Sequence, residues 1–229
     1  MTTLCIVATP IGNLEDISPR ALRILKEVDM VLCEDTRLTR KLLSHYDIHT
    51  PTLSYHSNSS EDKENKVIEL LKEGKNLALV SDAGTPAISD PGAKLVSAVR
   101  SAMPEDVAII AIPGPSALTS ALSVSGLPAS DFLFLGFLPH KKGRNSLFEE
   151  IATSSRTVVF YESPHRLLKT LDSLKNKLEE SRTLVISREI SKIYEEVVSG
   201  SVAEVEKYFI GNPEKVRGEF VLMVSGKSS

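Results

Sequence analysis

A thirteen-residue stretch, Val80–Gly92, constrains the fold more than any other part of the chain. It contains two Gly, two Pro, two Ser, one Thr and two Asp. Glycine permits positive φ and close approach of the backbone, whereas proline fixes φ and removes a hydrogen-bond donor. A strand-like run, 76–80, leads into it, and a helix-like run, 93–100, follows. Such a loop can be purely structural, but α/β proteins place ligands at the carboxyl ends of strands. We therefore interpret it as a ligand-binding loop.

The N-terminal half alternates short apolar runs with amphipathic runs, which predicts a parallel sheet flanked by helices. Ser18 and Pro19 form a helix start signal, and Gly74 is typical of the residue that follows a helix end. The expected strands are 4–8, 29–34, 52–55, 76–80 and 107–112, and the expected helices begin near Ser18, Asp35, Glu61 and Ala93.

Three loops rich in Gly and Pro follow three of these strands, at 9–17, 81–92 and 113–115. Parallel strands present their carboxyl ends at one edge of a sheet. If the three strands are neighbours, the three loops lie together, and we expect them to do so.

The C-terminal half alternates less regularly, which predicts a second α/β domain with a mixed sheet. The expected domains are 1–115 and 116–229. One helix, 164–178, is expected to bury Leu167, Leu168, Leu171 and Leu174. The other expected elements are strands 132–138, 157–161, 182–188, 195–198 and 219–224, and helices 116–123, 145–153 and 202–209.

Composition narrows the class of protein. No apolar run reaches the roughly 18 residues that a membrane span requires, and the N-terminus lacks a basic signal-peptide region. Cys5 and Cys33 lie in apolar runs, which is typical of reduced thiols in a cytoplasmic protein. The net charge of −3 gives no overall basic field, so a nucleic-acid role would depend on local clusters. Two clusters exist, either as solvated helix ends or as phosphate contacts: Arg37, Arg40 and Lys41, and His140, Lys141, Lys142 and Arg144.

Several classes of site are excluded by their missing motifs. The chain has no Walker phosphate loop, no Gly-x-Gly-x-x-Gly after the first strand and no Gly-x-Ser-x-Gly nucleophile elbow. Its five His show no metal-ligand spacing, so we expect no metal site. What remains is a pocket of backbone groups and small side chains, which suits a flat, partly apolar, zwitterionic ligand. Ile11 and Ile88 could sandwich an adenine whose edge the backbone reads.

Six sequence blocks, in chain order, resemble one family. They are ATPIGNLEDI at 8–17, CEDTR at 33–37, SDAGTPAISDPG at 81–92, PGPSA at 113–117, FYESPHR at 160–166 and RGEF at 217–220. The ribosomal RNA small-subunit methyltransferase I family, within the tetrapyrrole methylase superfamily, has similar motifs. The resemblance implies the two-domain fold of class III methyltransferases, with S-adenosylmethionine in the cleft between the domains. It also implies a homodimer and 2′-O-methylation of a cytidine in the decoding region of 16S rRNA of the small ribosomal subunit.

The same resemblance assigns the cofactor-binding positions by motif. They are Pro10, Ile11, Gly84, Thr85, Ile88, Ser116, Ala117, Tyr161 and Gly218.

Catalytic and RNA-binding candidates follow from chemistry. A ribose hydroxyl is a weak nucleophile, so a nearby carboxylate would help as a general base. Such a carboxylate could equally pair with Arg37 or Arg166, or cap a helix. Asp82 and Asp90 are expected to hold the shape of their loop. Tyr55 and His56 either stack on a splayed base or are packed. The general-base candidates are Asp16, Glu34, Asp35 and Glu162, and the candidates for phosphate contacts are Arg37, Arg40, Lys141, Lys142 and Arg144.

Two rival functions stay open from the sequence. The first is methylation of a small tetrapyrrole, which would share the fold and the cofactor. The second is a non-catalytic module that senses RNA or a nucleotide with the same loops.

Overall fold

The computed structural model describes residues 1–56 and 61–227 of the chain. The chain divides into two compact units, Met1–Ser116 and Ala117–Ser229, which we call the N-terminal and the C-terminal unit. Within the described ranges, none of the helices combines the length and the apolar character that crossing a membrane would require.

The N-terminal unit is built on a five-stranded sheet with the order β3-β2-β4-β1-β5. Every neighbouring pair in it is parallel, which confirms the predicted parallel sheet. Strands β4, β1 and β5 are consecutive neighbours, so the three strands that precede the Gly/Pro loops lie side by side, as expected. The strands are β1 (Thr2–Val7), β2 (Met30–Cys33), β3 (Thr52–Ser54), β4 (Leu77–Leu79) and β5 (Val107–Ile112).

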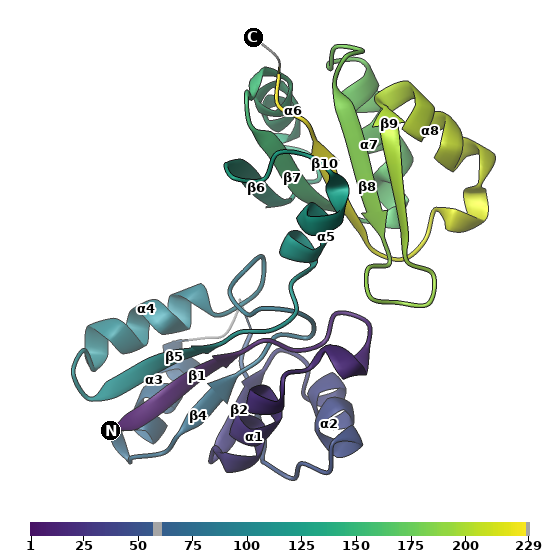
Figure 1. The fold of residues 1–229 in the computed structure, drawn as a ribbon. Coiled ribbons are helices and arrows are strands. Elements are labelled where there is room, and N and C mark those ends of the chain that lie inside the picture. The colour runs from purple at the N-terminus through teal and green to yellow at the C-terminus, as the bar shows by residue number, and fades with distance from the viewer. Residues whose placement is uncertain (57–60, 228–229) are drawn as a thin grey trace. The chain divides into compact units, whose positions relative to one another are not determined.

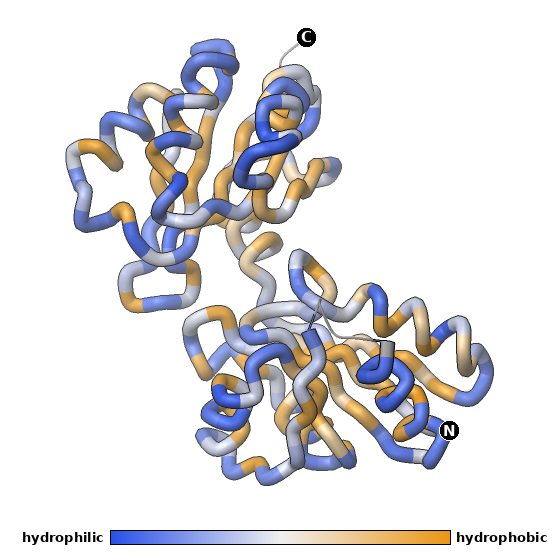
Figure 2. Tube along the Cα trace, turned by 180° about the vertical axis from the view of Figure 1, so that it is seen from behind, coloured by the Kyte–Doolittle hydropathy of each residue, from blue (hydrophilic) through white to orange (hydrophobic). Residues whose placement is uncertain are grey.

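Helices cover both faces of this sheet (Figure 1). Successive residues of a strand point to opposite faces, and β1 shows this clearly. Cys5 and Val7 pack with α1 (Pro19–Glu27) and α2 (Thr36–His45), whereas Leu4 packs with α3 (Glu61–Lys72) and α4 (Ala93–Ala102). The hydropathy colouring of Figure 2 accordingly shows apolar strands in the middle of the unit.

The helix boundaries of this unit follow from local chemistry. Ser18 caps α1 by accepting a hydrogen bond from the Ala21 amide at 3.0 Å, and Pro19 is its first helical residue. Asp35 caps α2 by accepting one from the Arg37 amide at 2.8 Å. Gly74 has a φ of +84°, the left-handed conformation of a residue just past a helix end. These predictions are confirmed; a short 3₁₀ helix, η1 (Leu14–Asp16), was not predicted.

The C-terminal unit contains a second five-stranded sheet with the order β6-β7-β10-β8-β9. Strands β6 and β7 are parallel, and the other three pairs are antiparallel, which confirms the predicted mixed sheet. The strands are β6 (Phe132–Phe137), β7 (Thr157–Glu162), β8 (Thr183–Arg188), β9 (Glu196–Ser201) and β10 (Phe220–Val224).

The faces of the second sheet are covered unequally (Figure 1). One face packs against three helices, α6 (Arg144–Thr153), α7 (Pro164–Lys175) and α8 (Val202–Gly211). The other face packs against α5 (Ala117–Ser125) through Ala121 and Leu122. A second 3₁₀ helix, η2 (Pro213–Lys215), was not predicted.

Two predictions for α7 are wrong. Leu167, Leu171 and Leu174 are buried, but Leu168 is 41% exposed, because a helix turns by about 100° per residue and carries it off the apolar stripe. The helix also ends at Lys175 instead of Leu178, with Asn176 as its C-cap residue. Leu178 then packs against the core from the following turn.

Candidate functional site

The loops after β1 and β4 are joined by an isolated antiparallel bridge between Thr9 and Gly84. The Thr9 amide donates to the Gly84 carbonyl at 2.9 Å, and the Gly84 amide donates to the Thr9 carbonyl at 3.0 Å. The Thr9 hydroxyl also donates to the Ser81 carbonyl at 3.2 Å. Main-chain bonds therefore fix the two loops against each other at the carboxyl edge of the sheet.

The loop after β5 is hydrogen-bonded to the loop after β4. The Thr85 hydroxyl donates to the Pro115 carbonyl at 3.1 Å. Gly84 has a φ of +81°, and a Cβ there would lie 3.3 Å from Cγ2 of Ile11. This close approach explains the glycine, because a side chain would be strained and would crowd Ile11. The structure thus brings five predicted cofactor residues onto connected loops: Pro10, Ile11, Gly84, Thr85 and Ile88.

The electrostatic character of these three loops is acidic. None of them contains Lys or Arg, whereas they contain Glu15, Asp16, Asp82 and Asp90. Burial, followed by the nearby Glu34 charge, raises the pKa of Asp90 from 3.8 to about 6. A surface of this kind is poorly suited to a polyphosphate, and it suits a ligand that carries a cationic centre.

The loop after β2 meets the loop after β4 through Asp82, whose carboxylate accepts from the Asp35 amide at 3.2 Å. Asp35 is itself paired with the Arg37 guanidinium at 2.7 Å. The hydrogen bonds from Arg37, side chain first, lower the pKa of Asp35 from 3.8 to about 2. A carboxylate with so low a pKa is a weak base, so the structure favours the capping and pairing alternative for Asp35.

The other general-base candidates lie in different settings. Asp16 ends η1 and Glu34 directly follows β2, and both side chains belong to exposed residues of the N-terminal unit. Glu162, at the end of β7 in the C-terminal unit, is fully buried. It is paired with Arg144 at 3.1 Å and with Arg166 at 2.6 Å. This pairing favours a structural role for Glu162, and for Arg144 it favours the same role over a phosphate contact.

The cofactor residues predicted for the C-terminal unit lie on α5, on β7 and just before β10. Tyr161 and Ala117 both pack on the hydrophobic cluster beneath α5. The Tyr161 ring packs edge-on against Phe134, with centroids 5.1 Å apart. Gly218 precedes β10 with a φ of +89°, and the Glu189 side chain occupies the place that a Cβ would need. Ser116 is the last residue of the N-terminal unit and adjoins Pro115.

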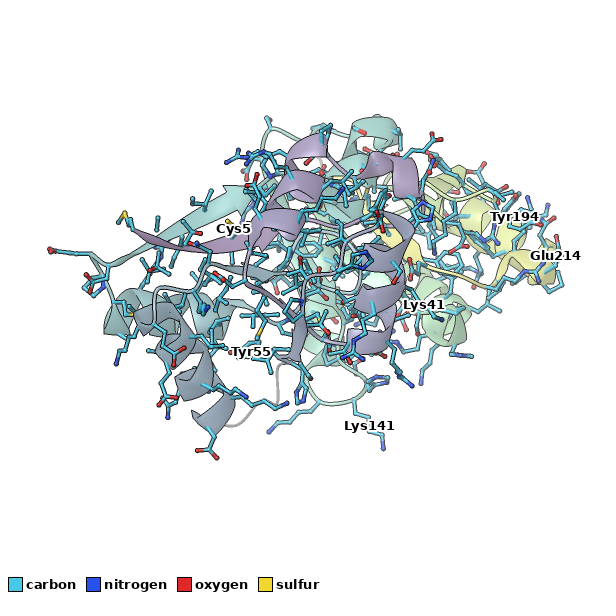
Figure 3. The ribbon with its side chains drawn as sticks, turned by 90° about the horizontal axis from the view of Figure 1, so that it is seen from below. Cys5, Lys41, Tyr55, Lys141, Tyr194 and Glu214 are labelled. Atoms are coloured by element: carbon cyan, nitrogen blue, oxygen red, sulfur yellow. The ribbon has the colours of Figure 1, made fainter. Side chains whose placement is uncertain are left out.

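The remaining RNA-binding candidates are exposed. Arg37, Arg40 and Lys41 lie on α2, although Arg37 is paired with Asp35 and Arg40 donates to the Thr52 hydroxyl at 3.1 Å. Lys141 and Lys142 belong to the loop between β6 and α6, and Figure 3 shows Lys141 extending away from this loop. Tyr55 is 4% exposed and packs in the core against α3 and α4, so the packed alternative holds for it.

Sequence reasoning missed the hydroxyls of Thr9 and Ser81, each of which lies two residues after the end of a strand. The Thr9 hydroxyl joins the loops after β1 and β4, whereas the Ser81 hydroxyl donates within its own loop, to the Ala83 and Gly84 carbonyls at 3.2 Å. Their position at the strand ends was the available signal.

Among the residues that the structure describes, no group of three or more His, Cys, Asp or Glu could hold a metal ion.

Comparison with known proteins identifies the class. Residues 3–206 match the model of the family described as Tetrapyrrole (Corrin/Porphyrin) Methylases, so the chain belongs to that family. More particularly, it belongs to the ribosomal RNA small subunit methyltransferase I family. A member from Halalkalibacterium halodurans is 49% identical over 98% of this chain and 76% of its own length. A member from Thermotoga maritima is 46% identical over 99% of this chain and 100% of its own length.

Solved structures support the fold. The cobalamin biosynthetic enzyme cobalt precorrin-4 methyltransferase has a TM-score of 0.67 at 17% identity, covering 97% of this chain and 94% of its own. Uroporphyrin-III C-methyltransferase from Thermus thermophilus has a TM-score of 0.65 at 21% identity, covering 98% and 94%. At such identities the likeness establishes the fold alone, and it confirms the predicted tetrapyrrole-methylase architecture.

Proposed function

We propose that the chain transfers a methyl group from S-adenosylmethionine to the 2′-hydroxyl of a cytidine ribose in 16S rRNA of the small ribosomal subunit. The relatives named above carry an rRNA methyltransferase name at 46–49% identity over nearly the whole chain. The single observation that carries the proposal is the joining of three Gly/Pro loops at the carboxyl edge of the parallel sheet.

The loop residues fit the cofactor in charge and in shape. When bound, S-adenosylmethionine supplies a methyl group activated by its cationic sulfonium. Loops without Lys or Arg tolerate that cation, and their carboxylates favour it. The absence of a side chain at Gly84 lets Ile11 pack closely against the backbone of this loop, and Ile11 and Ile88 supply apolar contacts for a flat group. Pro10, Thr85, Ser116, Ala117, Tyr161 and Gly218 complete the set that we propose to hold the cofactor.

The chain's own residues would contribute mainly by positioning. Holding a ribose hydroxyl in line with the reacting carbon removes much of the entropic cost of the reaction. The hydroxyl must lose its proton, and Asp16 and Glu34 are the predicted carboxylates that remain for this role. Arg40, Lys41, Lys141 and Lys142 are proposed to hold the RNA through its phosphates, with Arg37 partly neutralised by Asp35.

The setting of the activity is also a proposal. Cys5 and Cys33 are free and buried, and burial raises the pKa of both thiols, which suits a reducing compartment. We therefore propose a cytoplasmic enzyme. From the resemblance of the six sequence blocks, we also propose that it works as a homodimer.

The test is a methylation assay with a labelled methyl donor. Assembled small ribosomal subunits and stripped 16S rRNA should be offered in parallel with a porphyrinogen. Label in a cytidine ribose of the rRNA would support the proposal. Label in the porphyrinogen alone would replace it with the small-molecule rival. Calorimetry with S-adenosylmethionine addresses the other rival, because failure to bind at millimolar cofactor would indicate a non-catalytic module.

A further inference from the structure

The loop between β6 and α6, residues 138–143, is held by two arginines, of which Arg144 is buried and Arg166 is partly buried, and we call it the basic loop. It contains Lys141 and Lys142, both exposed. The Arg166 guanidinium donates to the Leu138 carbonyl at 2.7 Å. The Arg144 guanidinium donates to the Pro139 carbonyl at 3.2 Å. Two main-chain carbonyls at the start of the loop are therefore held by charged donors.

Both guanidiniums depend on one carboxylate. Oε1 of Glu162 lies 2.6 Å from Nε of Arg166, and its Oε2 lies 3.1 Å from Nη2 of Arg144. Glu162 is 1% exposed as a residue and Arg144 is 8% exposed. Two positive charges thus share a single buried counter-charge, so removal of that charge leaves both arginines uncompensated.

Two further hydrogen bonds orient the carboxylate. The Thr170 hydroxyl of α7 donates to Oε2 of Glu162 at 2.7 Å, and the Ser163 amide donates to Oε1 at 2.8 Å. Nη2 of Arg144 also donates to the Thr170 hydroxyl at 2.6 Å. The carboxylate accepts bonds at both oxygens from four different residues. The carboxylate is therefore held in one orientation, and it pairs with the two arginines that bond to the basic loop.

We propose that Glu162, through Arg144 and Arg166, positions the basic loop so that Lys141 and Lys142 meet the phosphates of the RNA substrate. Glu162 is then a positioning residue that never touches the RNA. The proposal rests on the RNA-methylating function argued above. It replaces the general-base role for Glu162 with one in substrate affinity.

The test uses three variants of the full chain that weaken the network to different degrees. Glu162→Gln keeps the shape but removes the charge, Arg166→Lys keeps the charge but loses the donor to Leu138, and Thr170→Val removes one hydroxyl. The expected order of effect is Glu162→Gln, then Arg166→Lys, then Thr170→Val. If Glu162→Gln does not fold, the two milder variants carry the test. Glu149→Gln is the matched control, because Glu149 is a 63% exposed carboxylate of α6 in the same unit.

Two readouts separate local loosening from loss of function. Trypsin cleavage after Lys141 or Lys142, identified by mass spectrometry, should accelerate about tenfold in Glu162→Gln because the loop opens more often. The KM for RNA should rise by a similar factor, while kcat and the KM for S-adenosylmethionine stay near wild type. The slope of RNA affinity against salt should also flatten. A purely structural role elsewhere in the unit would not give this split.

Specific outcomes would overturn the proposal. Unchanged cleavage in both Glu162→Gln and Arg166→Lys would mean that the network does not hold the loop. Faster cleavage with an unchanged KM for RNA would mean that the loop position does not matter to the substrate. A fall in kcat at unchanged KM for RNA would return Glu162 to the chemistry. Failure of the proposed function itself looks different, because the wild type would then methylate no RNA while the cleavage assay still reported on the network.

Discussion

The two units hold the loops to which we assign functions in opposite ways. In the N-terminal unit, the loops after β1, β4 and β5 are joined by neutral bonds, namely the Thr9–Gly84 bridge and the Thr85 hydroxyl on Pro115. In the C-terminal unit, the basic loop is held by Arg144 and Arg166, which both pair with the buried carboxylate of Glu162. Both arrangements fix a loop at a sheet edge, but they leave different electrostatic surfaces.

The difference reflects what each loop is proposed to bind. A site for a cationic sulfonium cannot be anchored by arginines beneath it, because like charges would repel the ligand. A loop that presents lysines to phosphates can be anchored in that way, since a net positive charge below it favours the same ligand. Neutral anchors also allow a close approach of the backbone, which the positive φ of Gly84 makes possible. The predictions below test each side of this comparison.

The largest effect is expected from Gly84→Val. The added side chain would crowd Ile11 at a residue with a φ of +81°, and we expect cofactor affinity to fall at least about 100-fold by calorimetry. Gly74→Val is the matched control, because Gly74 has a φ of +84° with nothing within 4 Å of an added Cβ. Both variants bear the same backbone strain, but the control should still bind cofactor. Normal binding by Gly84→Val would show that these loops are not the site.

The next largest effect concerns the charged side of the comparison. Lys141→Ala together with Lys142→Ala should lower RNA affinity about tenfold and reduce the slope of log affinity against log salt by about 1.4 to 1.8. Lys72→Ala with Lys75→Ala removes the same charge from the end of α3 and should leave both quantities unchanged. Equal effects of the two pairs would mean that only net charge matters and would move the RNA surface elsewhere.

Asp90 tests the acidic character of the N-terminal loops. Its folded pKa is raised from 3.8 to about 6, so its stabilising contribution is fully present below pH 3.8 and is lost as the pH rises through about 6. The change that Asp90→Asn makes in the free energy of unfolding should therefore be more favourable at pH 7 than at pH 4. After allowance for solvent screening, we expect a difference of about 1 kcal/mol. Urea unfolding at the two pH values measures this. Asp62→Asn, at an exposed residue of α3, is the control variant. An effect of Asp90→Asn that is the same at both pH values would contradict the prediction.

The smallest effect is expected from Thr85→Val, which keeps the side-chain shape and removes the bond to the Pro115 carbonyl. The free energy of unfolding should fall by about 1 kcal/mol, the usual contribution of one hydrogen bond. Cofactor affinity should fall a few-fold, because the loops after β4 and β5 are no longer joined. Thr153→Val is the control, since its hydroxyl bonds only within α6. If Thr153→Val lowered the free energy of unfolding more than Thr85→Val, the bond between Thr85 and Pro115 would stabilise the protein no more than a bond within a helix.

The sequence predicted best where local chemistry decides the outcome. Ser18 and Asp35 cap their helices as expected, since a cap is made by residues two or three positions apart. The three Gly/Pro loops were also predicted, since each is marked by its own residues after an apolar run. Leu168 was misplaced because four leucines in eight residues of one helix leave the edge of the apolar face ambiguous.

The sequence could not predict which charged residues far apart in the chain form ion pairs. Asp35 with Arg37 was weighed as an alternative, but nothing in the chain says that Arg144 reaches Glu162 across 18 positions. Arg144 therefore resembled its exposed neighbours Lys141 and Lys142. Asp90 was likewise assigned to loop shape alone, because its raised pKa depends on burial and on Glu34 from another strand's end.

The sequence by itself determined the parallel and mixed sheets, the positions of the Gly/Pro loops and the family, because each rests on local patterns or on motifs in chain order. Only the tertiary structure decided how the loops are joined and which charged side chains pair with one another within a unit. The physical reason is that hydrogen bonds and ion pairs depend on distances in space, and strand order alone brings β4, β1 and β5 together. The Thr9–Gly84 bridge and the Glu162 network exist because the sheets place residues far apart in the chain within reach of one another.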